Sequence, residues 1–237
     1  MSLIKITNNT YCVGDIHGQP SGMEYTIREK EIRDSSMILV GDIGLGFAGN
    51  HVGPCSRLEK IAAEFNLTFY LFRGNHDNPE SFTLHREMLE KRFPHVKILN
   101  DFDVLELNDG QRALIIGGSV SIDKAYRKEG KNWWLGELID YKNIPTEHYD
   151  MVISHSGPTP PLLQGGSPFF DGVREHCYSK NASVGDVVKE EQEEIMRALQ
   201  NIKPDLWVNG HFHVHEVFKV GNTNVIALDI DEMLRIC

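Results

Sequence analysis

Short apolar runs alternate with amphipathic stretches through the first hundred residues. The runs predict β-strands at 10–13, 37–40 and 67–72, each ending at or beside a glycine. Helices are predicted between and after them at 23–33, 56–65 and 79–92, where apolar residues recur at helical spacing or a proline opens the first turn. This alternation is typical of parallel strands joined by crossover helices.

The second half of the chain is dominated by short strand candidates. Strands are predicted at 96–99, 104–107, 113–116, 151–154 and 206–209, and as a hairpin at 214–220 and 223–228. A helix with an acidic, exposed face is predicted at 187–201, and residues 157–183 are predicted to form a long loop because they are rich in proline, glycine and serine. No repeat or linker interrupts the pattern, so we expect a single domain over residues 1–237.

Composition and charge narrow the class of protein. Apolar residues make up 41% and charged residues 24% of the 237 residues, as in an ordinary globular protein, and no apolar run approaches the roughly 20 residues that span a bilayer. The net charge of −10 argues against a broad cationic surface for extended nucleic acid. Four scattered cysteines and an N-terminus without the features of a signal peptide predict free thiols and a cytoplasmic location.

Polar motifs follow the predicted strands, where open α/β sheets bind their ligands. The five motifs are Gly14-Asp15-Ile16-His17-Gly18, Gly41-Asp42, Arg73-Gly74-Asn75-His76-Asp77, Ser154-His155-Ser156-Gly157 and Gly210-His211-Phe212-His213. Taken singly, most could be ordinary turns or helix caps. Taken together, they offer two Asp, one Asn and four His as metal ligands.

This mixture of oxygen and nitrogen ligands suits a pair of divalent metal ions better than a structural zinc, which is usually closed by four ligands that include thiolates. The two oxygens of Asp42 allow one carboxylate to bridge both ions. Paired metal ions are a device for in-line attack on phosphorus. The residues therefore predict a dinuclear metallophosphoesterase, with a phosphate ester as its substrate.

Other polar residues are predicted to be structural or solvated. The acidic run 189–194 is predicted to be the wet side of a helix, and 229–232 a solvated turn. Phe212 is predicted to point into the core, and His215 to be a surface or supporting residue rather than a ligand. The remaining histidines are predicted to be exposed or packed: His51, His85, His95, His148 and His176.

The order and spacing of the five motifs resemble those of the calcineurin-like metallophosphoesterase superfamily, from about residue 10 to residue 228. The resemblance implies an α/β (α+β) fold, in which a two-sheet β-sandwich is flanked by helices in four layers. It also implies two divalent metal ions, with Mn²⁺ favoured and Fe, Zn, Ni or Mg as alternatives. A hydroxide between the two ions would be the nucleophile.

The resemblance assigns roles residue by residue. One metal ion would be held by Asp15, His17, Asp42 and His213, and the other by Asp42, Asn75, His155 and His211. His76 would protonate the departing oxygen or stabilise the transition state, and Asp77 would orient it. Arg73 would bind a phosphoryl oxygen.

The chain departs from the protein serine/threonine phosphatases, which follow the second motif with Asp-Arg-Gly and end the third with Glu. Here Ile43-Gly44 follows Asp42, and the third motif ends in Asp77. A further segment resembles an insert of bacterial and phage members of the superfamily. It comprises Gly117-Gly118-Ser119-Val120-Ser121-Ile122-Asp123, Arg127, Trp133-Trp134 and Glu137. We expect Arg127 to bind phosphate there, while the tryptophans either line the pocket or anchor a local core.

Three functions are weighed. Hydrolysis of a phosphomonoester is favoured because Arg73 can help to neutralise a dianionic phosphate. The alternative is a phosphodiesterase acting on cyclic nucleotides or nucleic acid ends. A non-catalytic metal-dependent scaffold belongs to a different class, and it is disfavoured because His76 and all seven candidate ligands are present.

Overall fold

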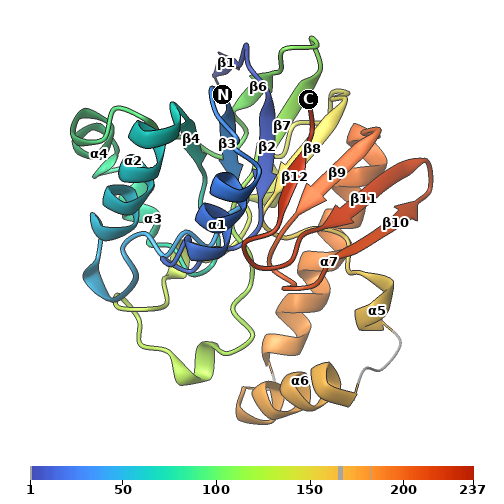
Figure 1. The fold of residues 1–237 in the computed structure, drawn as a ribbon. Helices are drawn as coiled ribbons and strands as arrows, with labels where there is room; N and C mark the ends of the chain where they lie inside the picture. The colour runs from blue at the N-terminus through green and yellow to red at the C-terminus, as the bar shows by residue number, and fades with distance from the viewer. Residues whose placement is uncertain (1, 165–167, 182) are drawn as a thin grey trace.

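The computed structural model describes residues 2–164, 168–181 and 183–237. Two β-sheets lie face to face, and helices cover their outer faces (Figure 1). The parallel strands run downward in Figure 1, away from the end of the molecule where both chain termini lie. The architecture confirms the four-layer sandwich that the sequence resemblance implied.

The first sheet is built mainly from the N-terminal half of the chain. Its strand order is β12-β2-β3-β4-β5, in which β2 to β5 are parallel and β12 pairs antiparallel with β2. The strands are β2 (Thr10–Val13), β3 (Ser36–Leu39), β4 (Thr68–Leu71), β5 (Val96–Ile98) and β12 (Met233–Arg235). The helices on its outer face are α1 (Ser21–Glu29), α2 (Gly53–Phe65), α3 (Pro79–Phe82) and α4 (Arg86–Arg92).

The second sheet has mixed strand directions and the order β1-β6-β7-β8-β9-β11-β10. Its strands are β1 (Leu3–Lys5), β6 (Val104–Glu106), β7 (Arg112–Ile116), β8 (Met151–Ser154), β9 (Leu206–Asn209), β10 (Glu216–Val220) and β11 (Thr223–Ala227). The remaining elements are the 3₁₀ turns at Phe47–Gly49 (η1), Lys124–Tyr126 (η2), Leu135–Glu137 (η3) and Tyr141–Asn143 (η4), and the helices α5 (Pro161–Gln164), α6 (Pro168–Lys180) and α7 (Ser183–Ile202).

Three apolar clusters separate the four layers. Along β3, the side chains alternate: Met37 and Leu39 face helices α1 and α2, while Ile38 faces the second sheet. The cluster between the two sheets also contains Ile153 from β8. Helix α7 covers the outer face of the second sheet, where the buried residues of α7 recur at helical spacing: Ile195, Ala198, Leu199 and Ile202.

Two predicted elements are wrong. The helix predicted at 79–92 is divided into α3 and α4, because the backbone leaves helical geometry at Thr83, with φ −115° and ψ −77°. The long loop predicted at 157–183 contains α5 and α6. Pro161 and Pro168 each begin a helix, a position at which proline is compatible with helical geometry because its missing N–H needs no partner.

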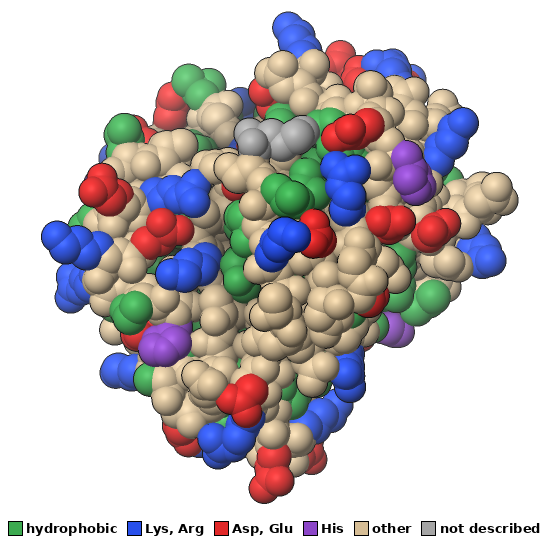
Figure 2. Space-filling view, turned by 90° about the horizontal axis from the view of Figure 1, so that it is seen from above, with side chains coloured by type: hydrophobic (Ala, Val, Ile, Leu, Met, Phe, Trp, Pro, Cys, Tyr) green, Lys and Arg blue, Asp and Glu red, His purple; other side chains and the backbone are tan. Residues whose placement is uncertain are grey.

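The surface carries charges of both signs. Figure 2 shows the face at the top of Figure 1, where basic and acidic side chains are interspersed rather than gathered into a continuous basic patch. Among the described residues, no helix has the length and apolar character required to cross a membrane.

Candidate metal centre

The polar motifs meet at one edge of the sandwich, because each follows a strand whose carboxyl end points to that edge. The loops concerned follow β2, β3, β4, β8 and β9. Several of the candidate ligands adopt positive φ angles: 44° at His17, 49° at Asp42, 67° at His211 and 52° at His213. For a non-glycine residue this conformation costs on the order of 1 kcal/mol and is typical of functional sites.

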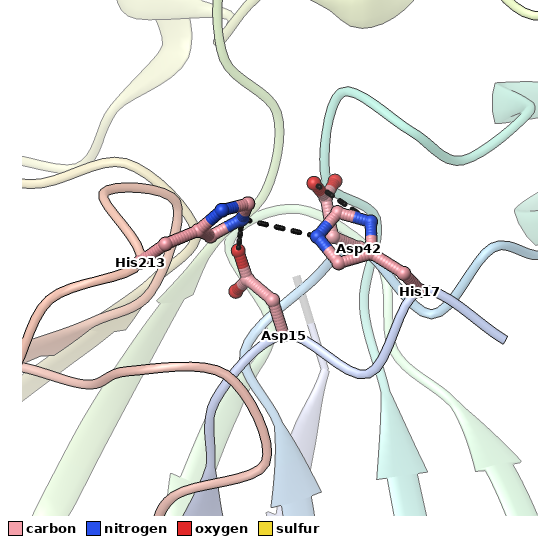
Figure 3. Close-up of side chains that lie close together, drawn as sticks. All are labelled: Asp15, His17, Asp42 and His213. Carbon is pink, nitrogen blue, oxygen red and sulfur yellow. Dashed lines mark hydrogen bonds and ion pairs between the residues drawn. The ribbon is translucent and has the colours of Figure 1, made fainter. Parts of the chain in front are cut away.

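A first group of donors consists of Asp15, His17, Asp42 and His213, one atom of each lying within 4.8 Å of the others (Figure 3). The Nε2 atoms of His17 and His213 are 3.0 Å apart, and Nε2 of His213 lies 3.0 Å from Asp15 Oδ2. Two imidazole nitrogens and two carboxylates that face one point form a donor set suited to a divalent metal ion. The four residues are those that the resemblance assigned to one ion.

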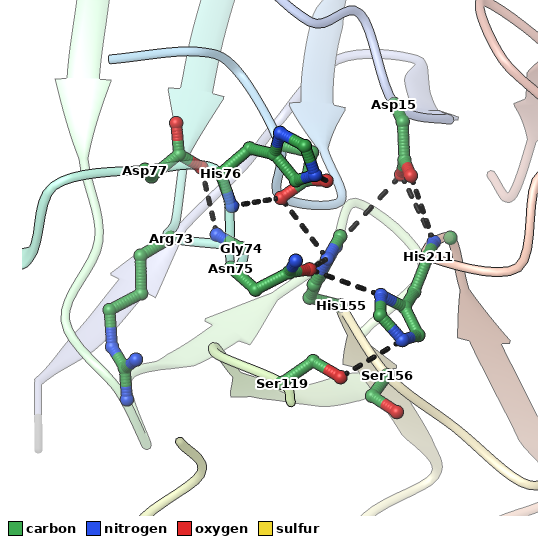
Figure 4. A network of polar contacts seen from close by, with 12 residues as sticks. Asp15, Arg73, Gly74, Asn75, His76, Asp77, Ser119, His155, Ser156 and His211 are labelled. Carbon is green, nitrogen blue, oxygen red and sulfur yellow. Dashed lines mark hydrogen bonds and ion pairs between the residues drawn. The ribbon is translucent and has the colours of Figure 1, made fainter. Parts of the chain in front are cut away.

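A second group of donors lies on the other side of Asp42. Asp42 Oδ1 is 3.2 Å from His155 Nε2, which lies 2.9 Å from Asn75 Oδ1. Nδ1 of His211 lies 3.1 Å from the same Asn75 oxygen. The structure therefore brings together the four side chains predicted for the second ion, of which Asn75, His155 and His211 are labelled in Figure 4. Asp42 also belongs to the first group.

The surroundings of His155 show how negative this centre is. Burial alone would lower the pKa of His155, but the carboxylates of Asp42 and Asp15 outweigh burial and raise the pKa to about 10. Its Nδ1 lies 2.8 Å from the Val40 carbonyl oxygen, which leaves Nε2 facing Asn75 and Asp42. Two carboxylates beside a buried imidazole make this position favourable for a cation, and the donor set fits a metal ion there.

Arg73 lies outside the centre, which corrects the prediction that it binds phosphate. Its guanidinium donates through Nε and Nη2 to Asp101, at 3.1 and 2.8 Å. The remaining N–H groups donate to the backbone carbonyls of Gly136, Glu137 and Leu138, each at 2.9 Å. With its five donors occupied, Arg73 braces the insert against β4 and points away from the ligand cluster (Figure 4).

Asp77 supports the backbone rather than the His76 ring. Its buried carboxylate accepts hydrogen bonds from the backbone N–H groups of Gly74, Ile43 and Leu45, at 2.8, 3.2 and 2.8 Å. These bonds tie the loop after β3 to the loop after β4. The predicted role in orienting the imidazole is therefore replaced by a role in holding Asp42 and Asn75 in register.

His76 and Arg127 meet beside Asp42. Nε2 of His76 lies 3.9 Å from Asp42 Oδ2 and accepts a hydrogen bond of 2.5 Å from Arg127 Nη2. Burial and the nearby Arg127 charge lower the pKa of His76 to about 4, although Asp42 opposes them, so the ring is neutral at pH 7. The Phe47 ring stacks on His76 with centroids 5.5 Å apart. Arg127 thus takes the position beside the centre that the insert was expected to provide.

A hydrogen-bonded pair in the insert, Ser121 and Glu137, holds both Asn75 and Arg127 in place. The Ser121 hydroxyl donates to Glu137 Oε2 at 2.6 Å, so its proton is committed. The hydroxyl oxygen of Ser121 in turn accepts hydrogen bonds from Asn75 Nδ2 and from Arg127 Nη1, both at 3.1 Å. Because Asn75 must present its amide nitrogen to Ser121, its carbonyl oxygen is directed towards His155 and His211.

A second buried carboxylate was missed by the sequence analysis. Glu191 belongs to the acidic run predicted to face water, yet it is 2% exposed and accepts from Ser119 Oγ, Val120 N and Ser156 Oγ at 3.1, 2.9 and 3.2 Å. Ser119 Oγ is also 3.1 Å from His211 Nε2. The available signal was its spacing, since Glu191 falls on the same helical face as Val184 and Ile195.

A cavity of about 430 Å³ opens from the centre towards the insert and helices α5 to α7. Asp42, Asn75, His76, His211 and His213 line its polar end. Phe212 also lines it, contrary to the predicted core position, because the positive φ angles of its two neighbours break the alternation of an extended strand. The described lining does not include Trp133 or Trp134, which are 7% and 8% exposed and act as local core anchors.

Comparison with known proteins identifies the class. A family model described as calcineurin-like phosphoesterase matches residues 9–215, and the chain belongs to that family. The protein is thus a metal-dependent phosphoesterase of a family that typically uses two metal ions, and hence a hydrolase of phosphate esters. Curated protein sequences gave no significant match.

Solved structures share the fold at low sequence identity. One covers 98% of this chain and 96% of its own, with a TM-score of 0.58 and 12% identity. The match to the phosphopantetheinyl hydrolase PptH from Mycobacterium tuberculosis covers 95% of this chain and 92% of that one, with a TM-score of 0.51 and 11% identity. A putative 5'-nucleotidase from Staphylococcus aureus matches with a TM-score of 0.48 and 15% identity, and the match spans 94% of this chain but 48% of that larger one.

Proposed function

We propose that this protein is a dinuclear metal-dependent phosphatase that hydrolyses a phosphomonoester. The observation that carries the proposal is the arrangement around Asp42, where two groups of metal donors share one carboxylate while His76 and Arg127 face the same cavity. We propose Mn²⁺ as the metal and the cytoplasm as the location, in keeping with four cysteines that are free in the structure.

The ligand assignment follows the two groups. Asp15, His17, Asp42 and His213 would hold one ion, and Asp42, Asn75, His155 and His211 the other. When bound, such ions supply an activated water and neutralise the charge that develops on the phosphoryl oxygens. The chain's own contribution is to position the ester and to manage the proton of the departing alcohol.

Arg127 supports the preference for a monoester. Its guanidinium reaches the cavity next to His76, and its Nε is paired with Asp123 at 2.7 Å, which fixes its direction. A monoester carries one more negative charge than a diester near neutral pH, so a fixed arginine favours the monoester. Of the two arginines predicted to bind phosphate, Arg127 is therefore the one that we propose as the phosphate ligand.

His76 is the proposed proton donor. In the structure its Nε2 accepts from Arg127 and the ring is neutral. A bound phosphate dianion attracts the guanidinium away from Nε2, and its negative charge raises the pKa of the imidazole. His76 can then take up a proton at Nε2 and pass it to the departing oxygen.

The test compares kcat/KM for nitrophenyl phosphate and bis-nitrophenyl phosphate with added Mn²⁺. We expect the wild-type protein to prefer the monoester. We expect kcat/KM for the monoester to fall by about 100-fold or more in His76→Ala and in Arg127→Ala, the size typical of lost acid–base or charge-assisted catalysis. His215→Ala and Arg86→Ala are the matched controls, because both side chains lie outside the cavity. A diester preference would point to the phosphodiesterase instead. No turnover with two bound metal ions would point to a scaffold.

A further inference from the structure

The cavity has an apolar end beyond the metal donors. Its walls come from three directions: the insert, helices α5 to α7, and the loop after β9. The apolar side chains of this end are Val120, Ile122, Leu163, Val188 and Phe212. Thr159, Tyr178 and Gln192 line the cavity as well, and the amide group of Gln192 is occupied by the backbone of Thr159 and Gly157. Because these side chains surround a space continuous with the donors, the group attached to the phosphate must lie against them.

The insert and α6 meet beside this space, through two side chains that do not belong to its described lining. The rings of Tyr126 and His176 stack with centroids 5.5 Å apart and planes 8° from parallel. The Tyr126 hydroxyl lies 2.6 Å from His176 Nε2. Tyr126 directly precedes Arg127, so the contact ties the proposed phosphate ligand to the helix on the opposite wall. Because this contact links the insert to α6 on one side of the cavity, the cavity suits a small ester better than a polymer as the substrate.

Charge limits the ester further. Among the described residues that line the cavity, Arg127 is the one Lys or Arg side chain, and it is paired with Asp123. The lining also includes Glu191, which lies behind the second donor group and whose buried carboxyl group accepts hydrogen bonds from Ser119, Val120 and Ser156. A second phosphate or a carboxylate on the substrate would meet no further cation there, and leaving it unpaired is costly.

We propose that the substrate is a small molecule with a single phosphate, esterified to an apolar group that packs against Val188, Ile122 and Phe212. This inference rests on the proposed phosphatase activity and adds the chemistry of the leaving group. It excludes nucleoside polyphosphates and strongly hydroxylated sugar phosphates as preferred substrates. Apolar contact supplies specificity at the far end, while the metal donors and Arg127 hold the phosphate.

Two matched ligand series test the proposal on the Mn²⁺-loaded protein. Linear alkyl phosphates from ethyl to hexyl keep the reactivity of the leaving alcohol nearly constant, so kcat/KM is expected to rise about threefold with each added methylene that enters the apolar end. The corresponding alkylphosphonates cannot be hydrolysed as esters, and calorimetry is expected to show the same increase in affinity. Glucose 6-phosphate is expected to be a poorer substrate than hexyl phosphate.

The variant Val188→Asn places an amide in the apolar wall, while Val187→Asn makes the same change at a half-buried neighbour outside the described lining. We expect Val188→Asn to flatten the chain-length dependence and Val187→Asn to retain it. Thermal melting and inhibition by inorganic phosphate report the fold and the phosphate site of each variant.

The two levels of the proposal fail differently. Phosphonates whose affinity rises with chain length, together with no hydrolysis of any ester, would overturn the phosphatase activity but support the apolar site. Hydrolysis or binding that is independent of chain length, or a preference for the sugar phosphate, would overturn the apolar site. No binding by any member of either series would overturn both.

Discussion

The two donor groups differ in how they meet solvent. In the first group, the side chains of His17 and His213 are 28% and 40% exposed. In the second, His155 is fully buried and Asn75 is 3% exposed. The second group is also held from behind by the Ser121–Glu137 pair and by Ser119, whereas the exposed imidazoles lack comparable buried support among the described residues. From this contrast we expect one tightly held metal ion and one that exchanges more readily.

The largest effect is expected where the two groups join. Asp42→Asn removes the charge that both ions would share, and losing several kcal/mol of electrostatic stabilisation should lower kcat/KM by about 1,000-fold or more. Metal analysis should show fewer than two ions per chain. Asp109→Asn, in an exposed turn, is the matched control. Two retained ions with near-normal activity would exclude a bridging role.

Metal removal should separate the two groups. During chelation we expect biphasic loss, with the ion of the exposed group leaving first and the buried ion later. His213→Ala should abolish the fast phase and keep the slow one, because its ring belongs to the exposed group alone. A single phase for the wild-type protein would break the distinction between the two positions. The measurement is metal content and activity followed over time.

The next effect in size is expected from the hydrogen bonds that hold the second donor group from behind. Ser121→Ala removes the oxygen that accepts from both Asn75 and Arg127, so we expect weaker binding of the second ion, by about 10–100-fold, and a higher KM for the phosphate ester. Calorimetric metal titration and kinetics measure the two effects separately. Ser56→Ala, on helix α2, is the control. Unchanged metal affinity would show that Asn75 needs no such partner.

The last prediction concerns stability rather than chemistry. Burial raises the pKa of Glu191 to about 7, despite opposing hydrogen bonds from Ser119, Val120 and Ser156. Between the ordinary carboxyl value and 7, the folded state retains a proton that the unfolded chain releases, so the stability from this group is lost as pH rises through about 7. In metal-free protein, Glu191→Gln should remove up to about 3 kcal/mol of that pH dependence. Urea unfolding at pH 5 and pH 8 measures this dependence. If the free energy of unfolding changed equally between the two pH values in both proteins, Glu191 would not be a buried carboxylic acid.

The sequence predicts the fold, and it picks out the candidate donors that the structure brings together, because their signals are local. Strand-end motifs such as Gly14-Asp15 and Gly210-His211 stand directly after apolar runs, and parallel topology brings those ends together. Arg73 could not be placed in the same way, since its partners at Asp101 and residues 136–138 are distant in sequence. Glu191 was assigned to water because its neighbours are charged, although helical spacing turns it inward. Helices α5 and α6 were hidden by the prolines that begin them.

The centre also joins the two ends of the chain. His17 and His213, whose rings meet in the first donor group, are separated by 196 positions in the sequence. A nascent chain that has not reached its last strands therefore cannot assemble this half of the site, and a C-terminally shortened product would bind its metal incompletely. Once the chain is complete, the ion links distant segments and favours the folded state by mass action. Metal loading of the first donor group should accordingly require a chain that has been synthesised beyond His213.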